Sequence, residues 1–120
     1  MENNFTYKAI GIDVTEALES YIDKRMTPLL KKYSFIQKPM SIEIGKTTDH
    51  HKHGEIFFAE TKINLKDTTV FARTEGSDLY ATIDDLQSEL YTQLDTVKGK
   101  KFELFKRGAR KIKKLLRFEI

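Results

Sequence analysis

Cysteine and tryptophan are both absent from this chain of 120 residues. Without cysteine, the sequence excludes a disulfide scaffold and a cysteine-based zinc site, and it is compatible with a reducing compartment. No run of about 18 apolar residues occurs, so we expect no membrane-spanning segment. The start, Met-Glu-Asn-Asn, lacks the basic-then-apolar pattern of a secretory signal, which makes the cytoplasm the expected location. The nucleophile elbow of hydrolases, the Walker loop and the glycine-rich dinucleotide fingerprint are missing too, so we expect no enzyme, no cofactor and no small-molecule substrate.

The charge of the chain is divided unevenly along its length. Its size suits one domain with a single core, and its 39% hydrophobic and 32% charged residues are typical of a soluble globular protein. Residues 1–98 hold 12 Lys/Arg against 16 Asp/Glu, whereas residues 99–120 hold 9 against 2, which together give the net charge of +3. A strongly basic end on a mildly acidic body predicts an arm that binds a polyanion.

Apolar periodicity predicts four strands and two helices. Alternating apolar residues indicate strands, and apolar residues at spacings of three and four indicate helices. The first helix follows Thr15 as N-cap and contains Pro28, where we expect a kink or an early loosening of the helix. The second helix carries one continuous apolar stripe from Leu79 to Val97, and we expect it to stop at Gly99. The predicted order is strand 4–10, helix 15–33, strand 41–44, strand 56–65, strand 69–74 and helix 77–98.

This order predicts an α+β fold, β-α-β-β-β-α, with two helices packed on one face of a four-stranded sheet. We expect residues 1–98 to form this domain and residues 99–120 to form a basic C-terminal tail that is partly helical or disordered. The apolar residues of the tail recur at helical spacing, but Gly108 weakens a helix there by about 1 kcal/mol relative to alanine. We therefore expect a marginal amphipathic helix that orders when it is bound.

Two segments resemble one known family. Asp78-Leu79-Tyr80-Ala81-Thr82-Ile83-Asp84, followed by Leu90 and Gln93-Leu94, resembles the second helix of the ribosome hibernation-promoting factors, also named ribosome-associated inhibitors or sigma-54 modulation proteins. Val14-Thr15-Glu16-Ala17-Leu18 resembles the start of the first helix of that family. The resemblance implies a short-form factor, without the long-form dimerisation domain, that has a double-stranded-RNA-binding-like fold. It also implies a partner, the small ribosomal subunit in 30S and 70S particles, whose tRNA and mRNA channel the protein occupies to inhibit translation by steric occlusion.

Basic residues on the first helix and along the tail are the expected contacts to ribosomal RNA, because lysine and arginine neutralise backbone phosphates. The resemblance places Arg25 and Lys31 at basic positions of the family. The second helix departs from the family pattern, since Glu89 and Asp95 stand where basic residues are usual and would repel phosphate. Either the tail takes over that contact or this chain binds differently. The candidate rRNA-binding residues are Lys24, Arg25, Lys31, Lys32, Lys98, Lys100, Lys101, Lys106, Arg107, Arg110 and Lys111.

Several other interpretations stay open. The basic tail also suits a membrane-surface helix or a solvated segment, and the basic face of the first helix suits simple exposure to solvent. Asp49-His50-His51-Lys52-His53 is the one candidate metal cluster, but adjacent positions in a short loop converge poorly on a zinc ion, so we expect no metal there. A metal-dependent enzyme using this loop, a transcription-linked protein and a general RNA-binding protein are the competing functions.

Overall fold

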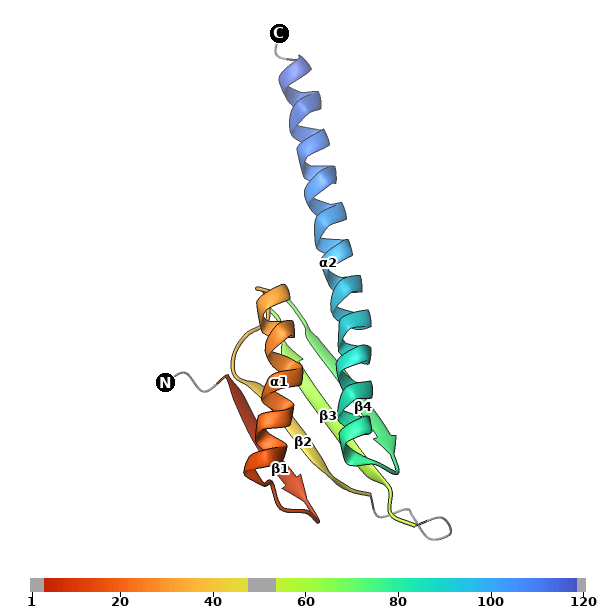
Figure 1. The fold of residues 1–120 in the computed structure, drawn as a ribbon. Helices are drawn as coiled ribbons and strands as arrows, with labels where there is room; N and C mark the ends of the chain where they lie inside the picture. The colour runs from red at the N-terminus through yellow and green to blue at the C-terminus, as the bar shows by residue number, and fades with distance from the viewer. Residues whose placement is uncertain (1–3, 48–53, 119–120) are drawn as a thin grey trace.

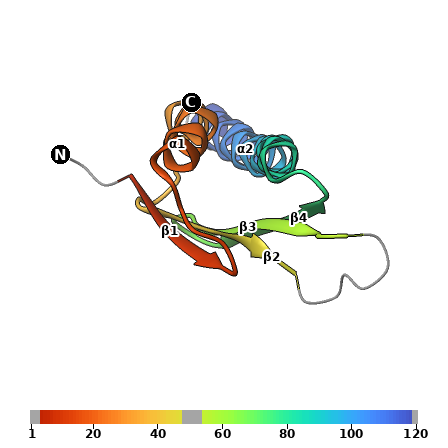
Figure 2. The same ribbon diagram turned by 60° about the horizontal axis from the view of Figure 1, so that its bottom comes forward.

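The computed structural model describes residues 4–47 and 54–118 as a four-stranded sheet with two helices. The elements are β1 (Phe5–Ile10), α1 (Glu16–Lys32), β2 (Met40–Lys46), β3 (Phe57–Asn64), β4 (Thr69–Gly76) and α2 (Leu79–Phe118). Both helices lie on the same face of the sheet, and the opposite face is left open by them (Figure 2). The predicted α+β order β-α-β-β-β-α is confirmed.

The strands are arranged in the order β1-β2-β3-β4. Strand β1 runs parallel to β2, and α1 makes the long connection that a parallel pair requires. The pairs β2-β3 and β3-β4 are antiparallel. A tight turn joins β3 to β4, in which the Leu65 N–H donates to the Thr68 carbonyl at 2.8 Å. The sheet is therefore mixed, with its one parallel pair at the β1 edge.

The core lies between the sheet and the two helices. Side chains alternate between the core and the outer face along β2 and β3, because successive residues of a strand point to opposite sides. The apolar stripe predicted on the second helix is buried between Ile83 and Leu94. The buried apolar residues include Leu18, Ile22, Met26 and Leu29 of α1, Ile42 and Ile44 of β2, Ala59 and Ile63 of β3, and Ile83, Leu86, Leu90 and Leu94 of α2.

Helix α1 begins where the sequence predicts and continues past Pro28. The Thr15 hydroxyl accepts a hydrogen bond from the Leu18 N–H at 3.1 Å, which confirms Thr15 as the N-cap. The helix runs one turn beyond Pro28 to Lys32, so the proline does not end it. A proline removes one backbone donor, and the fully buried ring of Tyr33, directly after the helix, anchors the final turn in the core.

Helix α2 does not stop at Gly99 but continues to Phe118 as one helix of 40 residues. A glycine that ends a helix usually adopts a positive φ, and within the described residues only Gly11 and Gly54 do so. Glycine destabilises a helix by about 1 kcal/mol relative to alanine, which is too little to end a helix whose next two residues are lysines, good helix formers. The stop predicted at Gly99 is therefore wrong.

The continued helix gives the molecule its elongated shape. Figure 1 shows α2 extending far beyond the end of the sheet, and the longest dimension of the molecule is 71 Å. We call residues 99–118 of α2 the arm. The functional division between residues 1–98 and a separate tail stays a prediction. Across the described ranges, no helix combines the length and the apolar character needed to cross a bilayer.

Candidate nucleic-acid interface

The four candidate cations of α1 fall into two pairs with different surroundings. Lys24 and Lys31 are exposed, and no ion pair involves either of them within the part of the chain that the structure describes. Arg25 and Lys32 each follow one position later in the helix and each meets an aspartate of α2. Lys24 and Lys31 thus form an exposed row on α1, and Arg25 and Lys32 form a second row at the α1-α2 contact.

Arg25 is held in a cluster that joins the two helices. Its Nε lies 2.9 Å from Asp84 Oδ1 and donates to the Tyr21 hydroxyl at 3.2 Å. The Tyr21 hydroxyl in turn donates to Asp84 at 2.6 Å, and this hydrogen bond raises the pKa of Tyr21. The Tyr80 ring meets the Tyr21 ring edge-on at 4.8 Å between centroids. The Asp84 carboxylate therefore offsets the charge that Arg25 would present to a phosphate.

Lys32 is held in a second cluster, which again combines a cation, an aspartate and tyrosines. Its Nζ lies 3.3 Å from Asp95 Oδ1 and 5.4 and 5.3 Å from the ring centroids of Tyr33 and Tyr91. The Tyr33 hydroxyl donates to the Asp95 carboxylate. Burial and then this carboxylate raise the pKa of Tyr33, while the hydrogen bond from Tyr33, followed by the one from Lys32, lowers the pKa of Asp95. Each cluster consists of a tyrosine and a cation from or next to α1 and an aspartate from α2.

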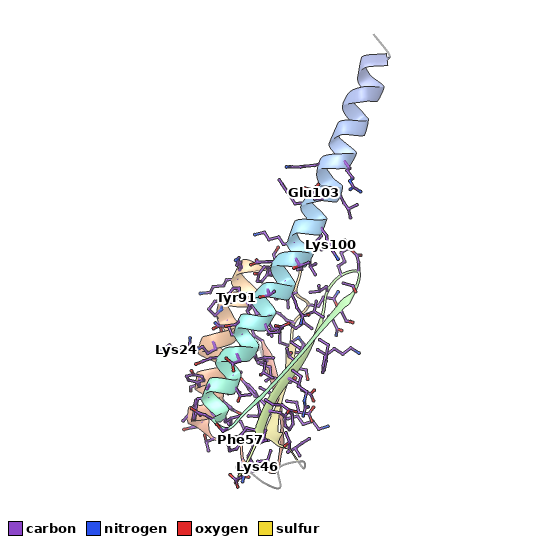
Figure 3. The ribbon with its side chains drawn as sticks, turned by 90° about the vertical axis from the view of Figure 1, so that its right-hand side faces the viewer. Lys24, Lys46, Phe57, Tyr91, Lys100 and Glu103 are labelled. Carbon is purple, nitrogen blue, oxygen red and sulfur yellow. The ribbon has the colours of Figure 1, made fainter. Side chains whose placement is uncertain are left out.

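The exposed row of α1 borders an open depression of about 710 Å³. Lys24 and Lys31 line it together with Pro28, and Figure 3 shows Lys24 at the outer side of α1. Asp23 lines it as well, and its carboxylate accepts a hydrogen bond from the Tyr7 hydroxyl of β1. This is the part of α1 that is free to meet an anion.

The candidate cations of α2 line the top of the body and the arm. Lys98, Lys100, Lys106 and Arg107 are exposed, and Figure 3 shows Lys100 where α2 passes the end of α1. Lys101 is half-buried, with its Nζ 3.4 Å from an aspartate in the β3-β4 turn. Arg110 and Lys111 also lie within the helical arm. Most of the predicted cations of the tail are therefore presented along one continuous helix.

The acidic residues of α2 that interrupt the family pattern are exposed but have hydrogen-bond partners within the protein. Asp95 bonds to Tyr33 and Lys32, and Glu89 accepts a hydrogen bond from Gln93 Nε2 at 3.0 Å, one turn later. Sequence reasoning identified Asp95 as repulsive to phosphate and missed its role as the partner of Lys32. No local signal reveals this pairing, because the two residues are 63 positions apart.

The outer face of the sheet has a different electrostatic character. Strand register places Lys8, Glu43, Glu60 and Arg73 in one row across the four strands, with the two glutamates directly opposite each other. The hydrogen bond that Glu43 shares with Glu60, followed by burial, raises the pKa of Glu43. Arg73 NH1 lies 3.3 Å from Glu60 Oε2. The row balances two cations with two carboxylates, so the excess positive charge lies with the helices.

The histidine cluster at residues 49–53 lies outside the described residues. Among the residues that are described, no group of three or more His, Cys, Asp or Glu side chains is placed to hold a metal ion. The candidate interface therefore consists of the exposed row of α1 and the cations at the top of the body and along the arm.

Comparison with known proteins finds one family and a consistent set of relatives. Residues 5–101 match the family described as "Sigma 54 modulation protein / S30EA ribosomal protein". The chain is 29% identical over 92 residues to a ribosome hibernation promoting factor of Azotobacter vinelandii, an alignment that covers 77% of this chain and 79% of that protein.

Two solved structures share the fold. A ribosomal subunit interface protein from Coxiella burnetii superposes with a TM-score of 0.64 at 23% identity, covering 79% of this chain and 97% of that one. The N-terminal domain of Protein Y from Thermus thermophilus gives a TM-score of 0.61 at 23% identity, covering 81% and 99%. Both alignments cover nearly the whole of the solved chain, so the shared fold accounts for almost all of each neighbour.

Proposed function

This chain belongs to the Sigma 54 modulation protein / S30EA ribosomal protein family, and from this premise we propose that it is a cytoplasmic, ribosome-associated hibernation factor. Family membership confirms the resemblance carried by the Asp78–Asp84 segment. We propose further that the protein occupies the tRNA and mRNA channel of the small subunit and inhibits translation by steric occlusion. No bond is made or broken in this mechanism.

One observation carries the proposal: exposed cations line α1 and a long helical arm, on the side of the sheet that the helices cover. Lys24 and Lys31 lie seven residues apart in the row next to the ion-paired Arg25, and both lack a carboxylate partner among the described residues. Lysine and arginine side chains that neutralise phosphates supply most of the affinity for nucleic acid. Because the arm is one helix continuous with the body, its charges are held at fixed spacing from those of α1.

The acidic clusters support the same arrangement. Asp84 and Asp95 would repel a phosphate backbone if they were free, but each is bonded to a tyrosine and to a cation. The contact between the helices therefore presents little net negative charge to an RNA that lies across them. The neutral outer face of the sheet offers no comparable surface, so the helical face is the one we assign to the ribosome.

Co-sedimentation with purified ribosomes tests the proposal. We expect the full chain to travel with 30S and 70S particles at low salt and to inhibit translation in a reconstituted system. A variant with Lys100→Gln, Lys106→Gln and Arg107→Gln keeps helix-forming residues, and its log–log salt dependence of binding should be shallower by roughly 2 to 3, at 0.7–0.9 for each lost phosphate contact. Circular dichroism checks that the arm remains helical.

The controls separate this function from the alternatives. A general RNA-binding protein would bind an unrelated structured RNA as tightly as it binds 30S subunits. An unchanged salt dependence in the triple variant would reject the role of the arm. A full chain that ignores ribosomes at low salt would overturn the proposed function.

A further inference from the structure

A groove of about 700 Å³ lies where α2 leaves the body, between the end of α1 and the base of the arm. Phe35 and Phe102 supply its aromatic surface, and the backbone of Gly99 forms part of its wall. Figure 3 shows Lys100 and Glu103, neighbours of these residues, on the stretch of α2 just above the end of α1. The sequence-based candidates included the lysines here but not the aromatic rings.

Gly99 keeps this groove open at a cost in helix stability. It is exposed, its φ is not positive, and a Cβ added to it would meet no atom within 4 Å. Neither backbone conformation nor packing therefore requires glycine at this position. In an exposed helix interior, glycine is about 1 kcal/mol less stable than alanine. What glycine provides is an uncovered stretch of helix beside the two aromatic rings.

Phe102 presents an exposed ring in the groove. Its side chain is 57% exposed, and the Nζ of Lys106 lies 4.7 Å from its ring centroid. The Phe35 ring is half-buried, with the Nζ of Lys101 5.5 Å from its centroid. The Asp67 carboxylate lies 3.4 Å from the same ammonium group. Each aromatic ring thus has an ammonium group over it.

The charge around the groove is positive. Lys32, Lys98 and Lys101 line it against a single carboxylate, Asp95. That carboxylate is already bonded to Lys32 and to the Tyr33 hydroxyl. Lys98 is exposed and no ion pair holds it within the described part of the chain. An accessible aromatic face beside cations that can reach a phosphate is the combination that binds single-stranded nucleic acid.

We propose that this groove binds one unpaired nucleotide of ribosomal RNA, with the base stacked on Phe102 and its phosphate neutralised by Lys98. The inference rests on the proposed function, because it names the contact that single-stranded rRNA makes with the base of the arm. The bare backbone at Gly99 admits the base edge-first against the helix. Stacking on an aromatic side chain is tolerant of sequence, so any of the four bases is accepted.

A tryptophan placed at Phe102 tests the proposal directly. The chain has no tryptophan, so Phe102→Trp gives a sole indole that keeps a stacking surface. Titration of this full-length variant with dodecamers of uridine or adenosine should quench the indole emission. Polyphosphate of equal charge, which has no bases, should bind without quenching. Phe102→Ala should weaken binding of the dodecamers roughly 5- to 150-fold relative to the parent, the range found for losing one stacked base.

Leu104→Trp is the matched control. Leu104 is 65% exposed on the same helix but does not line the groove, so the dodecamers should quench its indole much less than the indole at position 102, and polyphosphate should not quench it. Equal quenching of the two indoles, or quenching by polyphosphate, would overturn the proposal.

Gly99→Leu tests the groove without touching an aromatic ring or a charge. Leucine favours helix, so the thermal stability of the arm should rise, while its side chain fills the groove and oligonucleotide affinity should fall. Unchanged oligonucleotide affinity in this variant would overturn the proposal. Loss of the groove and loss of the proposed function are distinguishable. If the full chain binds ribosomes but the indole is not quenched, the proposed function is supported and the groove is rejected. If the indole is quenched but the chain does not associate with ribosomes, the groove is supported and the proposed function is rejected.

Discussion

The structure divides the basic residues of α1 into free and ion-paired cations, and this division predicts the outcome of a charge-neutralisation experiment. Replacing Lys24 and Lys31 by glutamine removes two exposed cations that have no carboxylate partner among the described residues. Replacing Arg25 by glutamine together with Asp84 by asparagine removes one ion pair and leaves the net charge unchanged. The two double variants test whether position on the helix or freedom from a partner determines an RNA contact.

The expected magnitudes follow from counterion release. Each phosphate contact contributes roughly 0.7–0.9 to the slope of log affinity against log salt, so loss of Lys24 and Lys31 should reduce the slope by about 1.4–1.8. At 0.15 M salt the same slope corresponds to about fivefold in affinity for each contact, or about 25-fold for the pair. The paired variant, Arg25→Gln with Asp84→Asn, should leave the slope within error of the parent because Arg25 is already neutralised at 2.9 Å.

Neither double variant should unfold the protein. Exposed substitutions usually change the free energy of unfolding by less than about 0.5 kcal/mol, and an exposed ion pair contributes about 0–1 kcal/mol. The Arg25–Asp84 pair belongs to this class, because both side chains are 40% exposed. Thermal melting of each variant therefore separates a loss of contacts from a loss of fold.

The assay is equilibrium binding to purified 30S subunits at salt concentrations from about 50 to about 300 mM. The slope of log affinity against log salt then gives the number of phosphate contacts. A reduced slope in the Lys24/Lys31 variant, with a parental slope in the Arg25/Asp84 variant, supports the division. A parental slope in the variant without Lys24 and Lys31, together with a reduced slope in the ion-pair variant, would refute this division of the cations.

Three further predictions concern stability. Leu90 is fully buried, so Leu90→Ala should lower the free energy of unfolding by about 2–5 kcal/mol in a denaturant titration. Glu43 lies opposite Glu60 and has a raised pKa, so the stability that protonated Glu43 contributes is lost as pH rises through that pKa. Glu43→Gln should therefore stabilise the protein by about 0.5 kcal/mol at pH 7, where the two glutamates repel each other. The same variant should have no effect on stability at a pH where both glutamates are protonated. Asp95 has a lowered pKa because Tyr33 donates to it, so its contribution is present above its ordinary pKa and is lost as pH falls through the folded value. Tyr33→Phe should therefore lower the melting temperature at pH 7, and the deficit should shrink in acid; a deficit that is constant with pH would contradict this.

Much of the fold could be predicted from local patterns in the chain. The alternation from Phe57 to Leu65 and the stripe from Leu79 to Val97 each report which side of an element faces the core, because burial imposes the period of the strand or helix on the sequence. Thr15 was identifiable as a cap since its hydroxyl serves a backbone N–H only three residues away. The end of the second helix was mispredicted because a glycine signal was weighed without the helix formers that follow it.

The sequence by itself determined the order of elements, the buried stripes, the basic bias of the last 22 residues and the family motif at Asp78–Asp84, all of which are properties of neighbouring residues. Only the tertiary structure decided which cations are free. Arg25 and Lys31 looked equivalent on one helix face, yet an aspartate 59 residues away neutralises the first and none among the described residues reaches the second. Such pairing depends on the register at which α1 and α2 pack, and packing register is set by the whole core and leaves no periodic trace in the chain.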